Sequence, residues 1–175
     1  RGFADYGFPE SHAVSFALIA YASSYLKCHY PAAFFMALLN SQPMGFYSPH
    51  ALLQSAQRDG VKVLPVCINR SNLDNTLENI SPEGKPPIYG IRLGLRLVTS
   101  FSNKAAPEVE RMRQEAGGQF ASVDDFLKRS RIYKNDLTAL AAANVFEMFG
   151  LDRRAAIWLA EAAPFCPVLE DVEDD

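Results

Sequence analysis

The stretch Ile88-Tyr-Gly-Ile-Arg-Leu93 decides how the second half of the chain is interpreted. Its apolar side chains alternate with other residues, and a period of two predicts a short β-strand. The residues beyond it change to helical periodicity, in short segments separated by turn residues. These segments predict four helices, at about 103–116, 123–130, 136–143 and 152–162.

Small polar residues precede the four predicted helices, at positions that favour helix N-caps. They are Ser102, Ser122, Asn135 and Asp152. Short helices on tight turns are a common architecture of helix-hairpin-helix modules. The sequence therefore predicts a mainly α fold, with one short strand element at the start of its second half.

The segment Ser81-Pro-Glu-Gly-Lys-Pro-Pro87 has the weakest packing signal in the chain. Its prolines and glycine disfavour helix and favour a turn or a linker. We therefore expect a front domain over residues 1–80, a linker over 81–87 and a second domain over 88–163. Residues 164–175 are expected to form an acidic tail.

The front domain is expected to be helical. Ser11 is a candidate cap for a helix that ends near residue 29, because Pro31 forces the residue before it out of the α region. Further helices are predicted over 31–40 and from Ser48-Pro49 to Gly60, each with proline in its first turn. Residues 61–65 are expected to be extended. The apolar face of the first helix comprises Ala13, Phe16, Ala17, Ala20 and Ser24, widened by Ile19 and Leu26.

The charge of the chain is unevenly distributed. The 175 residues include 17 Lys and Arg against 20 Asp and Glu, a formal net charge of −3, which by itself argues against nucleic-acid binding. Residues 1–87 are neutral, residues 88–163 carry 11 basic and 9 acidic side chains, and the last twelve residues carry −5. The predicted helical module is therefore weakly basic.

Several functional classes are disfavoured by the sequence. The three Cys and three His lack metal-ligand or disulfide spacing, so we expect no metal site and a reducing, cytoplasmic location. The longest apolar run, Val14 to Ala22, is too short to span a membrane, and no signal peptide is visible. No phosphate loop and no nucleophile with its base is recognisable, so no catalytic residue and no cofactor is assigned. Because the chain starts at Arg1, we expect a fragment of a longer protein.

The motif Tyr6-Gly-Phe-Pro-Glu-Ser-His-Ala13, with Leu26-Lys-Cys-His-Tyr-Pro-Ala32 behind it, resembles the end of the fingers domain of bacterial C-family DNA polymerases. These are the α subunits of DNA polymerase III. Replicative members usually have Asn-Lys where this chain has Pro9-Glu10. That difference, followed by Leu39-Asn-Ser-Gln-Pro-Met-Gly-Phe-Tyr-Ser-Pro49, is similar to the error-prone paralogue that acts in damage-induced mutagenesis.

The resemblance extends to about Trp158 and implies a tandem helix-hairpin-helix domain that binds duplex DNA behind the active site. In such a hairpin a small residue lets the turn approach DNA, and backbone N–H groups bind phosphate. The family usually has Val-Lys-Gly where this chain has Val98-Thr-Ser100, which predicts weaker phosphate binding by the first hairpin. The DNA-binding residues implied by the two hairpins are Thr99, Ser100, Phe101, Ser102, Asn144 and Val145.

The resemblance also implies a nucleotide site on the first helix. Ser11 and His12 stand at a helix start, where backbone N–H groups attract anions, although a plain cap with an exposed His explains them equally simply. The family match places them near the incoming nucleotide and the primer-template, with Tyr21 further along the helix. Lys27 is a candidate phosphate contact, with a Lys that extends along an apolar surface as the alternative.

The implied parent enzyme is a DNA-directed DNA polymerase active in DNA repair after DNA damage. The palm aspartates that hold magnesium are absent from this sequence, so we expect the fragment to be inactive alone. Its expected partners are DNA and, in the parent, the incoming nucleotide, while accessory mutagenesis proteins and the sliding clamp are expected to bind other regions. Gln42-Pro-Met-Gly-Phe46 lacks the Leu of a clamp-binding peptide. The alternative is a non-enzymatic helix-hairpin-helix module that binds DNA or docks a partner. For that half of the chain the expected core is Leu95, Phe101, Phe126, Leu140, Phe146, Phe149 and Trp158, and a largely exposed cluster of them would indicate an interface.

Overall fold

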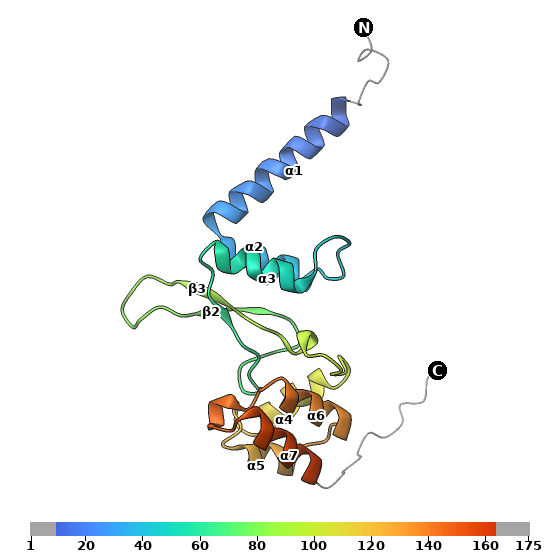
Figure 1. Cartoon of the computed structure of the whole chain (residues 1–175). Helices are drawn as coiled ribbons and strands as arrows, with labels where there is room; N and C mark the ends of the chain where they lie inside the picture. The colour runs from blue at the N-terminus through green and yellow to red at the C-terminus, as the bar shows by residue number, and fades with distance from the viewer. Residues whose placement is uncertain (1–9, 164–175) are drawn as a thin grey trace.

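The computed structural model describes residues 10–163, with side chains from His12 onward. Three helices form the front half, and Figure 1 shows the first of them standing away from the rest of the molecule. A small sheet lies in the middle, and a group of short helices lies at the opposite end. The front helices are α1 (Glu10–His29), α2 (Pro31–Asn40) and α3 (Pro49–Arg58).

Proline and serine set the starts of α2 and α3 as expected. Pro31 occupies the first turn of α2, where its missing N–H has no partner to lose. The Ser48 side chain accepts a hydrogen bond of 3.2 Å from the Ala51 N–H and so caps α3. These two helices pack on the sheet through a small core of Ala32, Phe35, Leu39, Leu52, Ala56, Val61 and Ile91.

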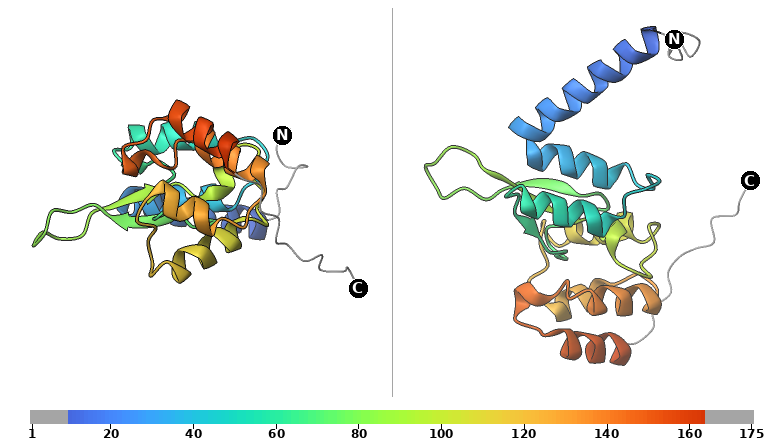
Figure 2. Two further views of the ribbon diagram at one scale, coloured as in Figure 1. Left: turned by 90° about the horizontal axis from the view of Figure 1, so that it is seen from below. Right: turned by 45° about the horizontal axis from the view of Figure 1, so that its top comes forward.

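Helix α1 differs from the sequence expectation in its start and in its surroundings. It begins at Glu10, so Ser11 lies inside the helix and does not cap it. The C-terminal end of α1 packs on α2, and Figure 2 shows the rest of α1 projecting from the molecule. Its large apolar residues are exposed because no other described element covers them, as Phe16 (60 %) and Ile19 (61 %) show. The predicted apolar face therefore forms no part of a core in this chain.

The three strands form one sheet, and its connectivity corrects the predicted linker. The strands are β1 (Val63–Leu64), β2 (Thr76–Asn79) and β3 (Tyr89–Arg92), in the order β1-β3-β2. β1 is parallel to β3, whereas β2 is antiparallel to it, with Leu77 opposite Ile91. Residues 81–87 thus form the tip of the hairpin between β2 and β3, within one sheet. The wider division into domains over 1–80 and 88–163 stays a prediction.

The loop of residues 66–75 connects the two halves and has no counterpart in the predicted elements. The Asn75 amide donates to Asn40 Oδ1 of α2 at 2.7 Å, and Asn75 Oδ1 accepts from the Gly94 N–H at 3.0 Å. On the other side, the Asn69 amide donates to the Phe120 carbonyl at 2.9 Å. We call residues 66–75 the connecting loop. Its buried polar groups are satisfied by both halves, which fixes their relative position.

The helical half comprises short elements joined by turns. They are η1 (Leu95–Leu97), α4 (Ala106–Glu115), α5 (Val123–Arg129), α6 (Lys134–Ala142), η2 (Glu147–Phe149) and α7 (Arg153–Ala162). Ser122 and Asp152 cap α5 and α7 through side-chain oxygens, as predicted. The predicted caps Ser102 and Asn135 are wrong, because α4 starts later, at Ala106, and α6 starts earlier, at Lys134.

The core of the helical half follows the predicted apolar residues with one exception. Leu95, Phe101, Phe126, Leu140 and Phe146 are buried. Phe149 is partly buried against the same cluster. Trp158, which was expected in this core, is instead 69 % exposed on α7. The mainly α fold with a small strand element is confirmed, and the exposed Trp158 is a feature that the pattern did not predict.

Candidate nucleic-acid interface

Two turns of the helical half have the same unusual backbone conformation. Ser100 (φ 65°) and Asn144 (φ 60°) are the non-glycine residues with positive φ within residues 10–163. This left-handed conformation costs an L-residue about 1 kcal/mol, with Asn more tolerant than Ser. Ser100 follows η1 and Asn144 follows α6, so both lie at the hairpin positions that the sequence indicates. We call residues 98–102 the first turn and residues 143–146 the second turn.

The first turn presents free backbone amides to solvent. Thr99 and Ser100 are exposed, and neither amide N–H has a hydrogen-bond acceptor among the described residues. Phe101 differs, because its side chain is buried and its N–H donates to the Val98 carbonyl at 3.3 Å. Two neighbouring free N–H groups at an exposed turn can bind a phosphate oxygen. Phe101 contributes packing, and its side chain is not available to DNA.

The next amide of the first turn donates a hydrogen bond to a carboxylate of α6. The Ser102 N–H donates to Asp136 Oδ1 over 2.6 Å. Asp136 is buried in the first turn of α6, at 5 % exposure. This internal acceptor satisfies the amide, so Ser102 has no N–H to offer a phosphate. The negative charge of Asp136 also opposes an anion close to Ser102.

The second turn faces the interior of the molecule. Val145 is 1 % exposed, and its carbonyl accepts a hydrogen bond of 3.1 Å from the Ile68 N–H of the connecting loop. Its own N–H is directed to the Leu140 carbonyl, and the Asn144 N–H to that of Ala141. Asn144 Oδ1 is buried and has no hydrogen-bond partner in the described structure. Val145 is thus unable to contact DNA through its side chain.

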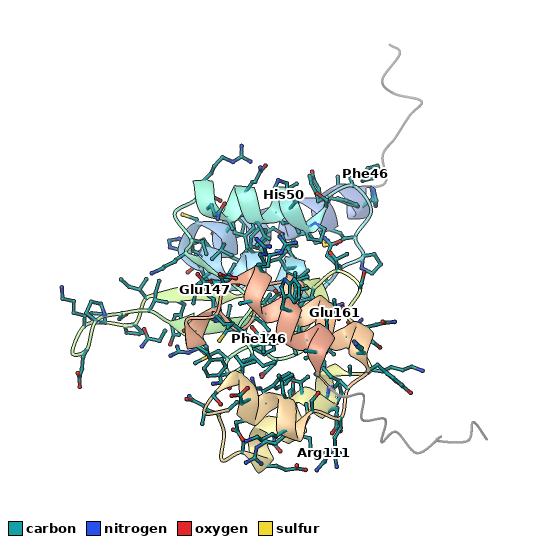
Figure 3. The ribbon with its side chains drawn as sticks, turned by 60° about the horizontal axis from the view of Figure 1, so that its bottom comes forward. Phe46, His50, Arg111, Phe146, Glu147 and Glu161 are labelled. Atoms are coloured by element: carbon teal, nitrogen blue, oxygen red, sulfur yellow. The ribbon has the colours of Figure 1, made fainter. Side chains whose placement is uncertain are left out.

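An open cleft of about 690 Å³ lies between α3, the first turn, α6 and the start of α7. It is lined by Pro49, His50, Leu53, Val66, Leu93, Arg96, Leu97, Val98, Thr99, Ala139, Ala142, Ala143 and Arg153. These include two arginines and a histidine, and no Asp or Glu. Figure 3 shows His50 on α3 and Phe146 among the helices of the other half. The lining therefore suits an anionic ligand.

The two arginines of the cleft differ in how they are held. Arg96 pairs with Asp74 at 2.7 Å and donates to the Asn40 carbonyl at 3.0 Å, so its position is fixed and its charge is partly neutralised. Arg153 is exposed in the first turn of α7 and forms no ion pair with any described carboxylate. Arg153 is consequently the cleft cation that can pair fully with a phosphate.

Four other basic side chains of the helical half, those of Arg111, Arg129, Arg131 and Lys134, pair with carboxylates. Arg129 pairs with Asp125 at 2.7 Å, and this hydrogen bond is the main reason that the pKa of Asp125 is lowered. Arg111 is bound to Glu108 at 2.8 Å, and this raises the pKa of its guanidinium. These pairs leave a weak field over that surface. The cations of the cleft are therefore more significant than the small net charge indicates.

The nucleotide-site residues of α1 lie apart from the cleft. The His12 ring packs against Phe16 with centroids 4.5 Å apart, and Tyr21 is 71 % exposed. Lys27 pairs with Asp59 at 3.1 Å and lies 5.7 Å from the centre of the Phe35 ring. None of these three lines the cleft, and the Ser11 side chain lies outside the described residues. Their proposed role stays a prediction.

The structure thus brings Thr99 together with residues that the sequence analysis did not single out. Those are His50, Arg96 and Arg153 in the cleft, and Asp136 behind the first turn. The pair Arg153-Arg154 directly after the second hairpin was the available signal for the α7 cations. No signal identified His50 or Asp136, because both reach the site through tertiary packing.

Two further features concern metal binding and membrane insertion. Within the described residues no three His, Cys, Asp or Glu side chains are grouped as metal ligands. No helix in that range is long and apolar enough to cross a membrane.

Residues 60–156 match the family model of the helix-hairpin-helix motif, and the chain belongs to that family. The match begins before β1, so it includes the connecting loop and the sheet.

Nearly the whole chain is also similar to error-prone DNA polymerases. The enzyme of Burkholderia mallei is 50 % identical over 167 residues, which cover 93 % of this chain and 15 % of that protein. The Rhodopirellula baltica enzyme is 45 % identical over 179 residues, covering 100 % of this chain and 15 % of that protein. Error-prone DNA polymerase 3 of Agrobacterium fabrum is 51 % identical over 163 residues, covering 93 % and 14 %. The chain thus spans about 15 % of the length of these relatives. Their names confirm the resemblance to the error-prone branch.

Proposed function

We propose that this chain is a DNA-holding segment of an error-prone DNA polymerase and that it binds the phosphate backbone of duplex DNA along the cleft. The supporting observation is the composition of that cleft, which contains two arginines, a histidine and no carboxylate. It also borders a turn with two free amides. DNA is the polyanion that the relatives' name implies for such a site.

The cleft groups supply two kinds of phosphate contact. Arg153 offers a full positive charge and a planar set of donors, which suits a bidentate contact with phosphate oxygens. The Thr99 and Ser100 amides offer short, sequence-independent hydrogen bonds. Neither contact reads base identity, so the proposed role is to hold the duplex in position. The Ser102 N–H is already bonded to Asp136, so the first turn offers phosphate the amides of Thr99 and Ser100 alone.

The polymerase reaction itself is assigned to the parent protein. Phosphoryl transfer uses metal ions that stabilise the attacking and leaving oxygens. We expect magnesium to be held by palm aspartates in the remaining 85 % or so of the relatives' length, and we expect this chain to be inactive alone. In the parent, α1 would face the incoming nucleotide and primer-template through Ser11, His12 and Tyr21. Lys27 is already bound to Asp59 and would contribute least.

The wider biological role follows the same relatives. We propose translesion synthesis during DNA repair after damage, in the cytoplasm. Accessory mutagenesis proteins and the sliding clamp would bind regions beyond these 175 residues. The alternative is a helix-hairpin-helix module that docks a protein partner, and such a partner would have to present carboxylates to Arg153, whereas DNA presents phosphates along its whole length.

Binding of the 175-residue chain to labelled primer-template DNA tests the proposal. Fluorescence anisotropy at low and moderate salt should give an affinity that falls as salt rises, because phosphate contacts release counterions. Arg153→Ala should weaken binding about 5- to 10-fold and reduce the salt slope by about 1. Arg58→Ala is the matched control, because Arg58 is exposed on α3 and does not line the cleft. Absence of binding at low salt, or equal losses in both variants, would contradict the proposal.

A further inference from the structure

The exposed indole of Trp158 stands beside two unpaired arginines. Trp158 is 69 % exposed although it is the only tryptophan of the chain and was expected in the core. Arg154 and Trp158 are four residues apart on α7, so their side chains share one face of the helix. Together with Arg153 and Ile157 they line a shallow depression of about 350 Å³. We call these four residues the α7 patch.

The charged residues that line the α7 patch are both arginines. Neither Arg153 nor Arg154 forms an ion pair with a described carboxylate. The acidic residue of α7, Glu161, is already engaged by Lys134 at 3.7 Å and by the Thr138 hydroxyl at 3.2 Å. The patch therefore combines a large flat apolar ring with two free cations. Its complement is a ligand that has flat rings and negative charges.

We propose that the α7 patch is a stacking platform for single-stranded nucleic acid, a site separate from the duplex cleft. A tryptophan ring stacks on a nucleobase, while neighbouring arginines hold the phosphates on either side of that base. Within a duplex the base faces are covered by the bases above and below, so only its two terminal pairs expose a face. Every base of an unstacked single strand can offer a face to Trp158.

The position of Arg153 connects this site to the cleft. Arg153 lines both the cleft and the α7 patch, so the two surfaces adjoin along the start of α7. A single strand that leaves a duplex held in the cleft would meet the patch at that point. A protein partner fits less well, because it would have to supply both an apolar face for Trp158 and a carboxylate for each arginine, whereas a single strand carries a base and a phosphate in every nucleotide.

Intrinsic fluorescence provides a direct test, because Trp158 is the only tryptophan in the chain. Titration of the 175-residue chain with a single-stranded thymidine oligonucleotide should quench the emission to a saturating plateau, whereas a blunt duplex should leave it nearly unchanged. Trp158→Ala should weaken single-strand binding, measured by anisotropy, by roughly 5- to 100-fold. Trp158→Phe should retain most of the affinity, because phenylalanine also stacks. Leu159→Ala is the matched control on the same helix and should bind like the unmodified chain.

The outcomes separate this inference from the proposed function. Unquenched emission at saturating single strand, or full affinity of Trp158→Ala, overturns the platform even if duplex binding depends on Arg153. Quenching by single strand without any duplex binding supports the platform and contradicts the proposed role of the cleft. Unquenched emission with concentration-dependent self-association in sedimentation assigns the α7 patch to protein contact and overturns the inference.

Discussion

The first and second turns have nearly the same backbone conformation but different surroundings. Ser100 and Asn144 both have φ near +60°. The first turn is exposed and offers the free amides of Thr99 and Ser100, whereas the second turn is tied to the connecting loop through Ile68 and Val145. Local conformation alone therefore does not make a phosphate site. The packing around each turn decides which backbone groups remain available.

The two turns also differ in the charged residues that lie next to them. The first turn has Thr99 in a position where the resemblance leads us to expect Lys, and Asp136 places a carboxylate behind it. The second turn is followed by Arg153 and Arg154, which have no described acidic partner. Thr99 of the first turn and Arg153, which follows the second, thus line one cleft. Each contribution can be removed or strengthened separately, which allows the comparison to be tested.

The largest expected effect is on the anchoring of the first turn. A Cβ at Gly94 would lie 2.4 Å from the Leu73 carbonyl oxygen, and the backbone of the connecting loop would have to move. Gly94→Ala should therefore lower the free energy of unfolding by about 3 kcal/mol. Gly90→Ala, whose Cβ would lie 2.8 Å from the Lys62 carbonyl oxygen, should cost less. Urea denaturation measures both, and equal stability of Gly94→Ala and the unmodified chain would contradict the reported packing.

The next effect is on the carboxylate that occupies the first turn. Asp136→Ala removes the charged acceptor of the Ser102 N–H and should cost about 2 kcal/mol of stability. It also frees that amide and removes a negative charge, so affinity for duplex DNA should rise several-fold despite the loss of stability. Asp136→Asn keeps an acceptor for the Ser102 N–H. Its free energy of unfolding and its affinity for duplex DNA should therefore lie between those of the unmodified chain and those of Asp136→Ala.

Denaturation and anisotropy on the same samples separate the two effects of Asp136. Asp124→Ala is the control, because Asp124 is an exposed acid on α5 without a described partner. If Asp136→Ala and Asp124→Ala change DNA affinity equally, the effect is one of net charge and the first turn is not the phosphate site.

The sequence predicted the elements better than the site. Pro31, Ser48, Ser122 and Asp152 act locally, so the helix starts that depend on them were predictable. β2 and the connecting loop were not, because their residues are polar and become ordered only through partners distant in the chain. Asn69, for example, pairs with Phe120 across 51 positions. Thr99 was predictable as an exposed residue beside the cleft because it lies in the turn itself. Arg96, His50 and Asp136 reach the site through tertiary packing.

The left-handed residues give a smaller effect in the opposite direction. Ser100→Gly removes the cost of a Cβ at positive φ and should raise stability by about 1 kcal/mol. Asn144→Gly should gain a similar amount, partly because it also removes the buried, unpartnered Oδ1. Only Ser100→Gly should also strengthen DNA binding, because only the first turn has exposed amides without an acceptor, whereas the Asn144 and Val145 N–H groups are bonded to Ala141 and Leu140. Stronger DNA binding by Asn144→Gly would show that the second turn contacts DNA as well.

The smallest expected effect is a pH dependence of the strand pair that precedes the first turn. Hydrogen bonds from Arg92, and to a lesser extent from Arg70, lower the pKa of Glu78 below its ordinary value of 4.5. A carboxyl with a depressed pKa in the folded state contributes stability above its unfolded pKa and loses that contribution as pH falls through the folded pKa. The unfolding free energy of the unmodified chain should therefore fall more steeply below about pH 4.5 than that of Glu78→Gln. Urea denaturation from neutral to acidic pH measures both slopes, and Asp125, whose pKa is also lowered, contributes equally to the two chains. Parallel profiles would mean that the ion pair with Arg92 does not stabilise the β2–β3 pairing that carries the first turn.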